Sequence, residues 1–298
     1  MTPVLEAAGL GKRYGRRWGL RDCTLAIPSG RIVGLVGPNG AGKTTLLHMA
    51  VGLLTPTTGT IEVLGSRPAS DQSQLDRIGF VAQDTPLYAQ LSVGDHLRFG
   101  ARTSRGWDKD LAQERIDQLD LDLDQRAGSL SGGQRAQLAL TLAVSKRPEL
   151  LLLDEPVASL DPLARRDFLK GLMEVVAEQE VSVVLSSHLL ADLERVCDYL
   201  IILAASRVQL IGDVEELLAT HHRLIGPRRD ASSLPRDQQV IEESHTERSS
   251  TLLVRSESPV LDPSWTVEGV TLDDLVLAYM GQAVTAQRQA KRRLEVKQ

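Results

Sequence analysis

One segment of the chain has the residue types and spacing of a loop that binds phosphate. Residues 37–44 read Gly-Pro-Asn-Gly-Ala-Gly-Lys-Thr, which fits G-x-x-x-x-G-K-[ST]. The glycines let successive backbone N–H groups turn inward around an anion, and a helix that follows adds its positive dipole end. A merely glycine-rich turn is the alternative. We expect a phosphate-binding loop made of Gly37, Pro38, Asn39, Gly40, Ala41, Gly42, Lys43, Thr44 and Thr45.

A second segment places two acids at the end of an apolar run. Residues 150–153 are four leucines, and Asp154 and Glu155 follow them directly. Carboxylates at the carboxyl end of a buried strand lie where α/β sheets bind ligands. Phosphoryl transfer needs positioning and charge neutralisation, so we expect Asp154 and Thr44 to hold Mg²⁺ and Glu155 to orient the attacking water. Without the phosphate loop, the two acids would equally suit a solvated helix cap.

The bulk composition allows a large folded domain and argues against several classes of protein. The chain has 298 residues, 42% of them apolar, so its content suffices for a packed core. A formal net charge of −5 argues against a dedicated nucleic-acid binder. Two cysteines without C-x-x-C spacing predict neither a disulfide framework nor a zinc site. The N-terminus has no apolar signal-peptide core, and no apolar run approaches the roughly 18–20 residues of a membrane span.

The pattern up to residue 220 alternates between strand-like and helix-like segments. Continuous apolar runs that alternate with helices predict a parallel sheet covered on both faces. Between residues 84 and 148 the pattern is mostly helical, with helices expected at 91–100, 109–119 and 131–145. We therefore predict an α/β core with a helical insert. The expected buried strands are 31–37, 77–82, 150–153, 181–185 and 200–203.

The composition changes after residue 220, which predicts a separate accessory segment over 221–281. Residues 223–239 contain a polar linker, 239–254 suit a hairpin, and 271–280 suit a capped amphipathic helix. We expect that a chain cut after Thr220 would still fold and bind ATP. Residues 282–298 form a basic tail, expected to be solvated or to touch anionic lipid, with Arg288, Lys291, Arg292, Arg293 and Lys297.

A third motif resembles a known family. Residues 129–135 read Ser-Leu-Ser-Gly-Gly-Gln-Arg, and this LSGGQ before the leucine run resembles the signature of ATP-binding cassette (ABC) ATPases. The resemblance covers about residues 4–220 and implies the P-loop NTPase core with its helical insert. It also implies roles for further residues: the signature Ser131, Gly132, Gly133 and Gln134, the adenine-stacking Tyr14, the lid glutamine Gln83, the D-loop Asp161 and the switch histidine His188.

The resemblance further implies how such a subunit works. The signature of one subunit closes on Mg·ATP held by a second ABC subunit, in a head-to-tail homodimer or heterodimer. A separate polytopic permease would dock on the insert, so the chain would be cytoplasmic and peripheral to the inner face of the membrane. Residues 271–280 resemble a helix of bacterial drug-type exporters, which favours export over import. The alternatives are a non-transport ABC ATPase of the translation or DNA-repair type, and a non-catalytic regulator, which would lack Glu155 or His188.

Overall fold

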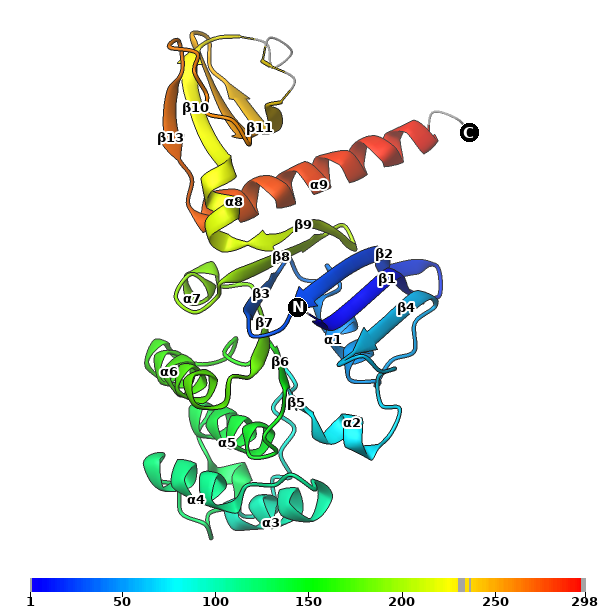
Figure 1. The fold of residues 1–298 in the computed structure, drawn as a ribbon, viewed down its shortest axis with the longest axis vertical. Helices are drawn as coiled ribbons and strands as arrows, with labels where there is room; N and C mark the ends of the chain where they lie inside the picture. The colour runs from blue at the N-terminus through cyan, green and yellow to red at the C-terminus, as the bar shows by residue number, and fades with distance from the viewer. Residues whose placement is uncertain (1, 230–233, 236, 296–298) are drawn as a thin grey trace.

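The computed structural model describes residues 2–229, 234–235 and 237–295, with side chains except at 288 and 290–295 (Figure 1). Its centre is a sheet of order β5-β6-β7-β3-β8-β9, parallel except for β9. The five expected strands are confirmed to within one or two residues as β3 Ile32–Val36, β5 Ile78–Val81, β6 Leu150–Asp154, β7 Ser182–Ser187 and β8 Tyr199–Ala204. The sixth strand, β9 Arg207–Asp213, was not expected.

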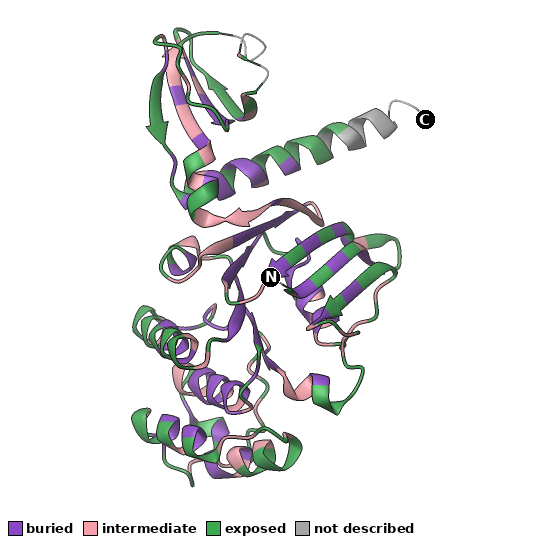
Figure 2. Cartoon of the chain, in the orientation of Figure 1, coloured by how far each residue is buried: buried purple, intermediate pink, exposed green. Residues whose placement is uncertain are grey.

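The order of these strands brings distant parts of the sequence to one edge of the sheet. β6, β7 and β3 are adjacent and parallel, so their carboxyl ends meet. All residues of these three strands are buried, and Figure 2 shows buried residues gathered along this sheet. Both faces are therefore covered, as the continuous apolar runs predict. The edge where the three strands end receives residues 37–45, 154–155 and 186–188.

A three-stranded antiparallel sheet of order β2-β1-β4 covers one side of the core. Its strands are β1 Pro3–Tyr14, β2 Arg17–Pro28 and β4 Thr58–Val63. It shares a hydrophobic cluster with α1 (Lys43–Ala50) and the central sheet, in which Leu10, Leu20 and Leu47 have no exposed surface. The sequence analysis did not predict this sheet. Its hairpin ends with Tyr14 and so delivers that side chain toward α1.

The predicted helical insert is present at the lower end of the molecule in Figure 1. Its helices pack around a small core of their own that includes Val93, Ile116 and Leu138. α6 (Pro162–Gln179) packs against α5 and connects the insert to the main sheet. The remaining helices are α2 Gln72–Asp76, α3 Val93–Thr103, α4 Lys109–Gln118, the 3-10 turn Ala127–Ser129, α5 Gly132–Val144 and α7 Leu190–Leu193.

The chain after residue 220 forms a second antiparallel sheet, of order β11-β12-β10-β13, and a long helix. The predicted hairpin is β11 and β12, and the predicted helix is capped at its start by reciprocal bonds between Thr271 and Asp274. The helix nevertheless continues to Glu295, because residues 282–295 contain neither Gly nor Pro. The helix therefore runs across the boundary expected at residue 281. The bounds are α8 Val214–Thr220, β10 His221–Pro227, β11 Gln239–His245, β12 Ser249–Arg255, β13 Thr266–Gly269 and α9 Leu272–Glu295.

The first half of α9 belongs to the main core. Leu275, Val276 and Tyr279 are buried in the same hydrophobic cluster as Leu200 and Ile202 of β8. The five charged side chains of the predicted basic tail lie outside the described residues. Within 2–229, 234–235 and 237–295, no helix is both long and apolar enough to cross a membrane.

A buried hydrogen bond adds to this attachment. His221 Nε2 lies 2.9 Å from the Tyr279 hydroxyl, and His221 Nδ1 lies 2.7 Å from the Leu217 carbonyl oxygen. Burial lowers the pKa of His221 and raises that of Tyr279, so both groups are neutral at pH 7. The neutral imidazole donates to Leu217 and accepts from Tyr279. The C-terminal segment is thus joined to residues 1–220 by packing and by polar contacts.

This joint core reverses the expectation for a chain cut after Thr220. Removing α9 would expose the apolar side chains of β8 and β9, at about 1.5–3 kcal/mol for each buried side chain affected. We expect the cut chain to aggregate, or to unfold at a temperature lower by about 10 °C or more. A chain cut after Gln287 keeps the buried half of α9 and should melt like the full chain. Equal melting temperatures for both truncations would contradict the shared core.

Candidate functional site

The phosphate loop connects β3 to α1, and its backbone requires glycine at two positions. A Cβ at Gly37 would lie 2.2 Å from the carbonyl oxygen of Leu203. Gly42 has φ +112°, and a Cβ there would lie 2.6 Å from the carbonyl oxygen of Gly19. Any larger residue would therefore clash with the backbone as well as strain the loop. The glycines therefore let the loop lie close to the neighbouring backbone of Gly19 and Leu203.

Lys43 is the first residue of α1, and its side chain is buried beneath the loop. Its Nζ donates to the Gly37 carbonyl oxygen at 2.7 Å and lies 3.1 Å from Oε1 of Glu155. The side chains of Lys43 and Glu155 are only 6% and 7% exposed. A charge that is so little exposed to water is destabilised unless an opposite charge lies beside it. The geometry thus joins the phosphate loop to the end of β6.

Ser186 on β7 fixes the two acids at the end of β6. Its hydroxyl donates to Asp154 Oδ1 at 2.8 Å and accepts from the Glu155 N–H at 2.9 Å. Glu155 has φ +49°, an uncommon conformation for a residue other than glycine. Such strain persists only where surrounding contacts hold it. Sequence reasoning missed Ser186, although it stands opposite Asp154 in the β6–β7 register.

His188 completes a continuous polar chain. Its Nδ1 lies 2.5 Å from Oε2 of Glu155, so the two Glu155 oxygens contact Lys43 and His188. The His188 side chain is 46% exposed, whereas that of Glu155 is buried. The exposed imidazole therefore faces solvent above the buried carboxylate. The predicted residues Lys43, Asp154, Glu155 and His188 are brought together.

Tyr14 also lies beside the phosphate loop. Its ring is so close to Gly19 that a Cβ there would lie 2.7 Å from Tyr14 Cε2 and 3.4 Å from Thr45 Oγ1. Tyr14 is 48% exposed, which leaves its ring available for stacking. Thr44 is exposed in the first turn of α1, and Gln83 is exposed just after β5. Among the described residues, neither side chain makes a hydrogen bond to the Lys43–Glu155–His188 chain.

The signature residues form a second group on the helices. Ser131 and Gln134 cap α5 reciprocally, and a Cβ at Gly133 would lie 2.8 Å from Ala164 Cβ on α6. Asp161 caps α6 by accepting from the N–H groups of Leu163 and Ala164 at 3.0 Å. Signature and D-loop are therefore neighbours. Within the described ranges, no hydrogen bond joins them to Lys43, Glu155 or His188.

Comparisons with known proteins agree with this arrangement. A family model described as ABC transporter matches residues 20–158. An uncharacterised ABC transporter ATP-binding protein of Bacillus subtilis, YxlF, is 35% identical over 222 residues, which cover 72% of each chain. The chain belongs to this ABC family. The sulfate/thiosulfate import ATP-binding protein CysA of Mesorhizobium japonicum is 34% identical over 78% of this chain and 70% of its own. The Nod factor export ATP-binding protein I of Rhizobium johnstonii is 33% identical over 70% and 68%.

A solved structure of the ATP binding subunit of an ABC transporter has the same fold. It superposes with a TM-score of 0.65 at 30% identity and covers 72% of this chain and 92% of that one. The chain is thus an ATP-binding subunit of an ABC transporter and an ATPase, which favours transport over translation or DNA repair. More than a quarter of the chain lies outside the superposed part.

The residues at the sheet edge fit a Mg²⁺ ion that would accompany ATP. Oδ2 of Asp154 is buried and has no hydrogen-bond partner among the described residues, while Oδ1 is held by Ser186. A buried carboxylate oxygen without a partner is costly unless a cation or water satisfies it. Carboxylate and hydroxyl oxygens are ligands that Mg²⁺ prefers. The donor set therefore fits a hard cation in the ABC ATPase.

The contacts of Ser186 generate a prediction. Ser186→Ala leaves Asp154 Oδ1 and the Glu155 N–H without their partner, so we expect a loss of about 1–3 kcal/mol of unfolding free energy. Because both carboxylates lose their fixed position, ATP turnover should fall about tenfold or more. Ser182→Ala is the matched control, since Ser182 begins the same strand and accepts only from the Gly30 N–H, at 2.9 Å. Denaturant unfolding measures the loss of stability, and phosphate release measures ATP turnover. Equal turnover in the two variants would contradict the role of Ser186 in holding the two acids.

Proposed function

We propose that this ABC ATPase binds Mg·ATP between two subunits and couples their closure to a separate membrane permease, most readily for export. One observation carries the proposal. Lys43, Glu155 and His188 form one connected site, whereas Ser131–Gln134 and Asp161 form another group with no hydrogen bond to it among the described residues. Complete sites then require a second subunit, placed head to tail, that presents its signature to the ATP.

The residues at the sheet edge divide the work of hydrolysis. Tyr14 would stack on adenine, residues 37–45 would hold the phosphates by their N–H groups, and Lys43 would contact the β- and γ-phosphates. As Lys43 turns from Glu155 to the phosphates, Oε1 of Glu155 becomes free to accept a hydrogen bond from the attacking water. His188 keeps the other oxygen oriented and presents its exposed edge to the γ-phosphate. Base catalysis of this kind is worth about 10²–10⁴-fold.

Mg²⁺, held by Asp154, Thr44 and Gln83, would neutralise charge on the phosphate oxygens. The buried Oδ2 of Asp154 supports this assignment most directly. Thr44 stands in the first turn of α1, and Gln83 follows β5, the strand beside β6. Both are exposed and can turn toward the nucleotide.

The direction of transport rests on weaker support. The similarity to the Nod factor export protein favours export, and so does the exporter-like sequence at the start of α9. The sulfate/thiosulfate import protein has similar identity, so import is the second candidate. Uptake of substrate into inside-out vesicles separates the two, because an exporter would accumulate substrate inside them and an importer would not. In either case we propose that the protein works at the cytoplasmic face of the membrane.

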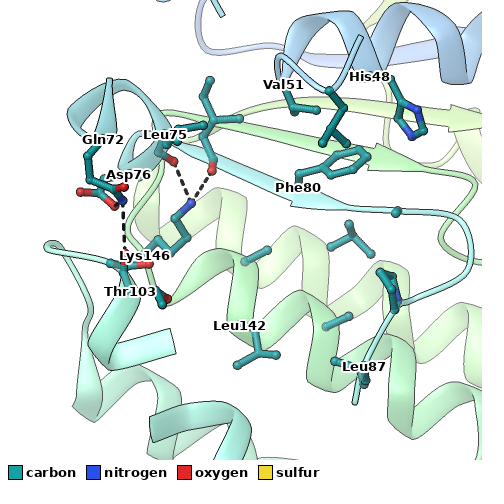
Figure 3. A pocket seen from close by; sticks show the side chains of 18 residues that line it. His48, Val51, Gln72, Leu75, Asp76, Phe80, Leu87, Thr103, Leu142 and Lys146 are labelled. Atoms are coloured by element: carbon teal, nitrogen blue, oxygen red, sulfur yellow. Dashed lines mark hydrogen bonds between the residues drawn. The ribbon is translucent and has the colours of Figure 1, made fainter. Parts of the chain in front are cut away.

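A cavity of about 710 Å³ supplies the surface on which we propose that the permease docks (Figure 3). It opens between the core and the helical insert, and Ala82, next to Gln83, is one of the residues that line it. Phe80 packs edge-on against His48 on one wall, with ring centroids 5.9 Å apart, while Leu142 lies on the other. Lys146 is held by the carbonyl oxygens of Leu75 and Ile78, both at 2.8 Å.

The shape and chemistry of this cavity suit one kind of occupant. Its lining is mostly apolar, and exposed Leu53 on the core side lines it too. Its walls come from both the core and the helical insert, so an inserted segment would be displaced when these two parts move relative to each other. We propose a short helix from a cytoplasmic loop of the permease, with its apolar face toward Phe80 and Leu142.

Filling the cavity should separate docking from hydrolysis. Ala139 lines the cavity from α5, so Ala139→Trp should reduce permease co-purification about tenfold while basal ATP hydrolysis stays within about twofold. Ala101→Trp places the same side chain at an exposed position on α3 and should have no effect. Membrane pull-down with the tagged chain measures binding. Undiminished capture by Ala139→Trp would exclude this cavity as the docking surface.

The catalytic role of Glu155 predicts a separation of binding from turnover. Glu155→Gln keeps Lys43, Thr44 and Asp154, so we expect ATP affinity within a few-fold of wild type. Hydrolysis should fall about 10²–10⁴-fold because the amide cannot accept a proton. The lost negative charge should also favour ATP-dependent dimers, visible by light scattering at high protein concentration.

The control for this variant is Glu149→Gln, which changes the residue before the same strand. Glu149 pairs with Arg77 at the surface and is 56% exposed. We expect its turnover to match wild type. Wild-type hydrolysis by Glu155→Gln would remove Glu155 from the mechanism, and an inactive variant that never dimerises would argue against head-to-tail closure.

A further inference from the structure

An ion pair outside the nucleotide site connects two helices that follow functional segments. Arg165, in the first turn of α6, places Nε 3.5 Å from Oδ2 of Asp192 on α7. The side chains are 24% and 10% exposed. Burial raises the pKa of the Asp192 carboxyl, and the charges of Arg165, Arg195 and His188 oppose that rise. The carboxylate is therefore buried at a desolvation cost in a largely cationic setting.

Arg165 also reaches the D-loop directly. Its second guanidinium arm donates from Nη2 to the Leu160 carbonyl oxygen at 3.3 Å, immediately before Asp161. The Leu160 side chain lies on the signature, since a Cβ at Gly132 would be 3.6 Å from Leu160 Cδ2. One guanidinium thus contacts a carboxylate on α7 and the backbone of the loop that supports the signature. The planar guanidinium presents its N–H groups in a rigid fork, so one side chain can face both acceptors at once.

Asp192 is attached as closely to the other functional segment. It follows His188 by four residues, and its N–H donates to the Leu189 carbonyl oxygen at 3.3 Å, which closes the turn between them. His188 in turn contacts Glu155. Glu155 is therefore connected to the D-loop by three contacts, Glu155–His188, Asp192–Arg165 and Arg165–Leu160, with the short turn of residues 188–192 between the first two.

A contribution to stability alone explains this pair poorly. Nε of Arg165 and Oδ2 of Asp192 are both buried, and neither has a hydrogen-bond partner in the described part of the chain. A buried ion pair with unsatisfied atoms repays its desolvation poorly. In Figure 1, α6 and α7 lie on the same side of the sheet. α6 follows the D-loop, and α7 follows residues 186–188, which we call the histidine segment.

We propose that Arg165 and Asp192 are positioning residues that lock the histidine segment to the D-loop and signature of the same subunit. His188 and Glu155 serve the ATP that a subunit holds, whereas Asp161 and Ser131 serve the ATP held by its partner. The pair makes these two groups move as one body. Each subunit thereby transmits the state of its own site to the surface it presents to the other. This inference rests on the head-to-tail dimer proposed above.

The test uses the full chain carrying Glu155→Gln, so that ATP-dependent dimers accumulate. Asp192→Asn and Arg165→Gln are each added, and ATP affinity of the monomer and the dimer association constant are measured separately. We expect ATP affinity within about twofold and a dimer association constant lower by about tenfold in each variant. The double variant should lose no more than either single one, because both remove the same link.

Three controls keep the result specific. Arg166→Gln removes the neighbouring α6 cation, which is 69% exposed, and should dimerise normally. Asp192→Glu keeps the negative charge, so its dimer association constant should be close to that of the chain with Asp192. In chains with Glu155 intact, the two test variants should lower kcat about tenfold while KM changes less than about twofold, and thermal unfolding confirms that they are folded.

The outcomes separate the two proposals. Unchanged dimer association in Asp192→Asn and Arg165→Gln, equal loss in Arg166→Gln, or parallel loss of ATP affinity would overturn the positioning role while leaving the dimer intact. Additive losses in the double variant would also overturn it, because the residues would then act separately. If Glu155→Gln alone never forms dimers with ATP, the proposed function fails first, and this inference fails with it.

Discussion

The buried contact between Lys43 and Glu155 is the interaction on which the rest of the site depends. The two side chains are only 6% and 7% exposed, so each charge requires the other or an equivalent partner. Three neighbours hold the pair in place. The Gly37 carbonyl oxygen accepts from Lys43, the His188 imidazole contacts the second oxygen of Glu155, and Ser186 fixes the backbone of Glu155. In the mechanism that we propose, a nucleotide phosphate that attracts Lys43 would also move the ammonium away from Glu155, so that binding of substrate would free this carboxylate to act as the base.

This pair can form only because of the strand order. β3 and β6 lie on either side of β7, so the phosphate loop and the two acids leave the same edge of the sheet with Ser186 and His188 between them. The signature begins a helix of the insert, and within the described ranges it makes no hydrogen bond to them. That placement supports the proposed division between a site that holds ATP and a surface that completes the site of another subunit. The Arg165–Asp192 pair is the link that we propose between them.

Local patterns were sufficient to predict that the phosphate loop and the two acids lie at one edge of the sheet. Glycine spacing determines a phosphate loop, and a four-leucine strand followed by two acids determines where those acids lie, because both signals are contained in a few consecutive residues. Ser186 could not be recognised, since its role depends on which strand lies beside β6. The β1–β2–β4 sheet was missed because its burial pattern is interrupted by register shifts, such as the one between Ala7 and Leu10.

The C-terminal segment illustrates the limit most clearly. A change of composition after residue 220 suggested independence, yet Leu275, Val276 and Tyr279 lie in the main core. Composition describes what a segment contains and says nothing of what it packs against. The roles of Gln83 and Thr44 also stay predictions, because both side chains are exposed and depend on the nucleotide for their place.

Cross-linking between subunits tests most directly the claim that ATP lies between the phosphate loop of one chain and the signature of another. Asn39 and Ser131 are both exposed, so each can be replaced by cysteine in one Glu155→Gln chain. Cys23 is buried and Cys197 partly buried, and burial raises the pKa of both thiols, that of Cys23 to about 12, so neither should compete. The account predicts covalent dimers that form on oxidation only with ATP and only when both cysteines are present. Absence of such dimers, or equal yield without ATP, would contradict it.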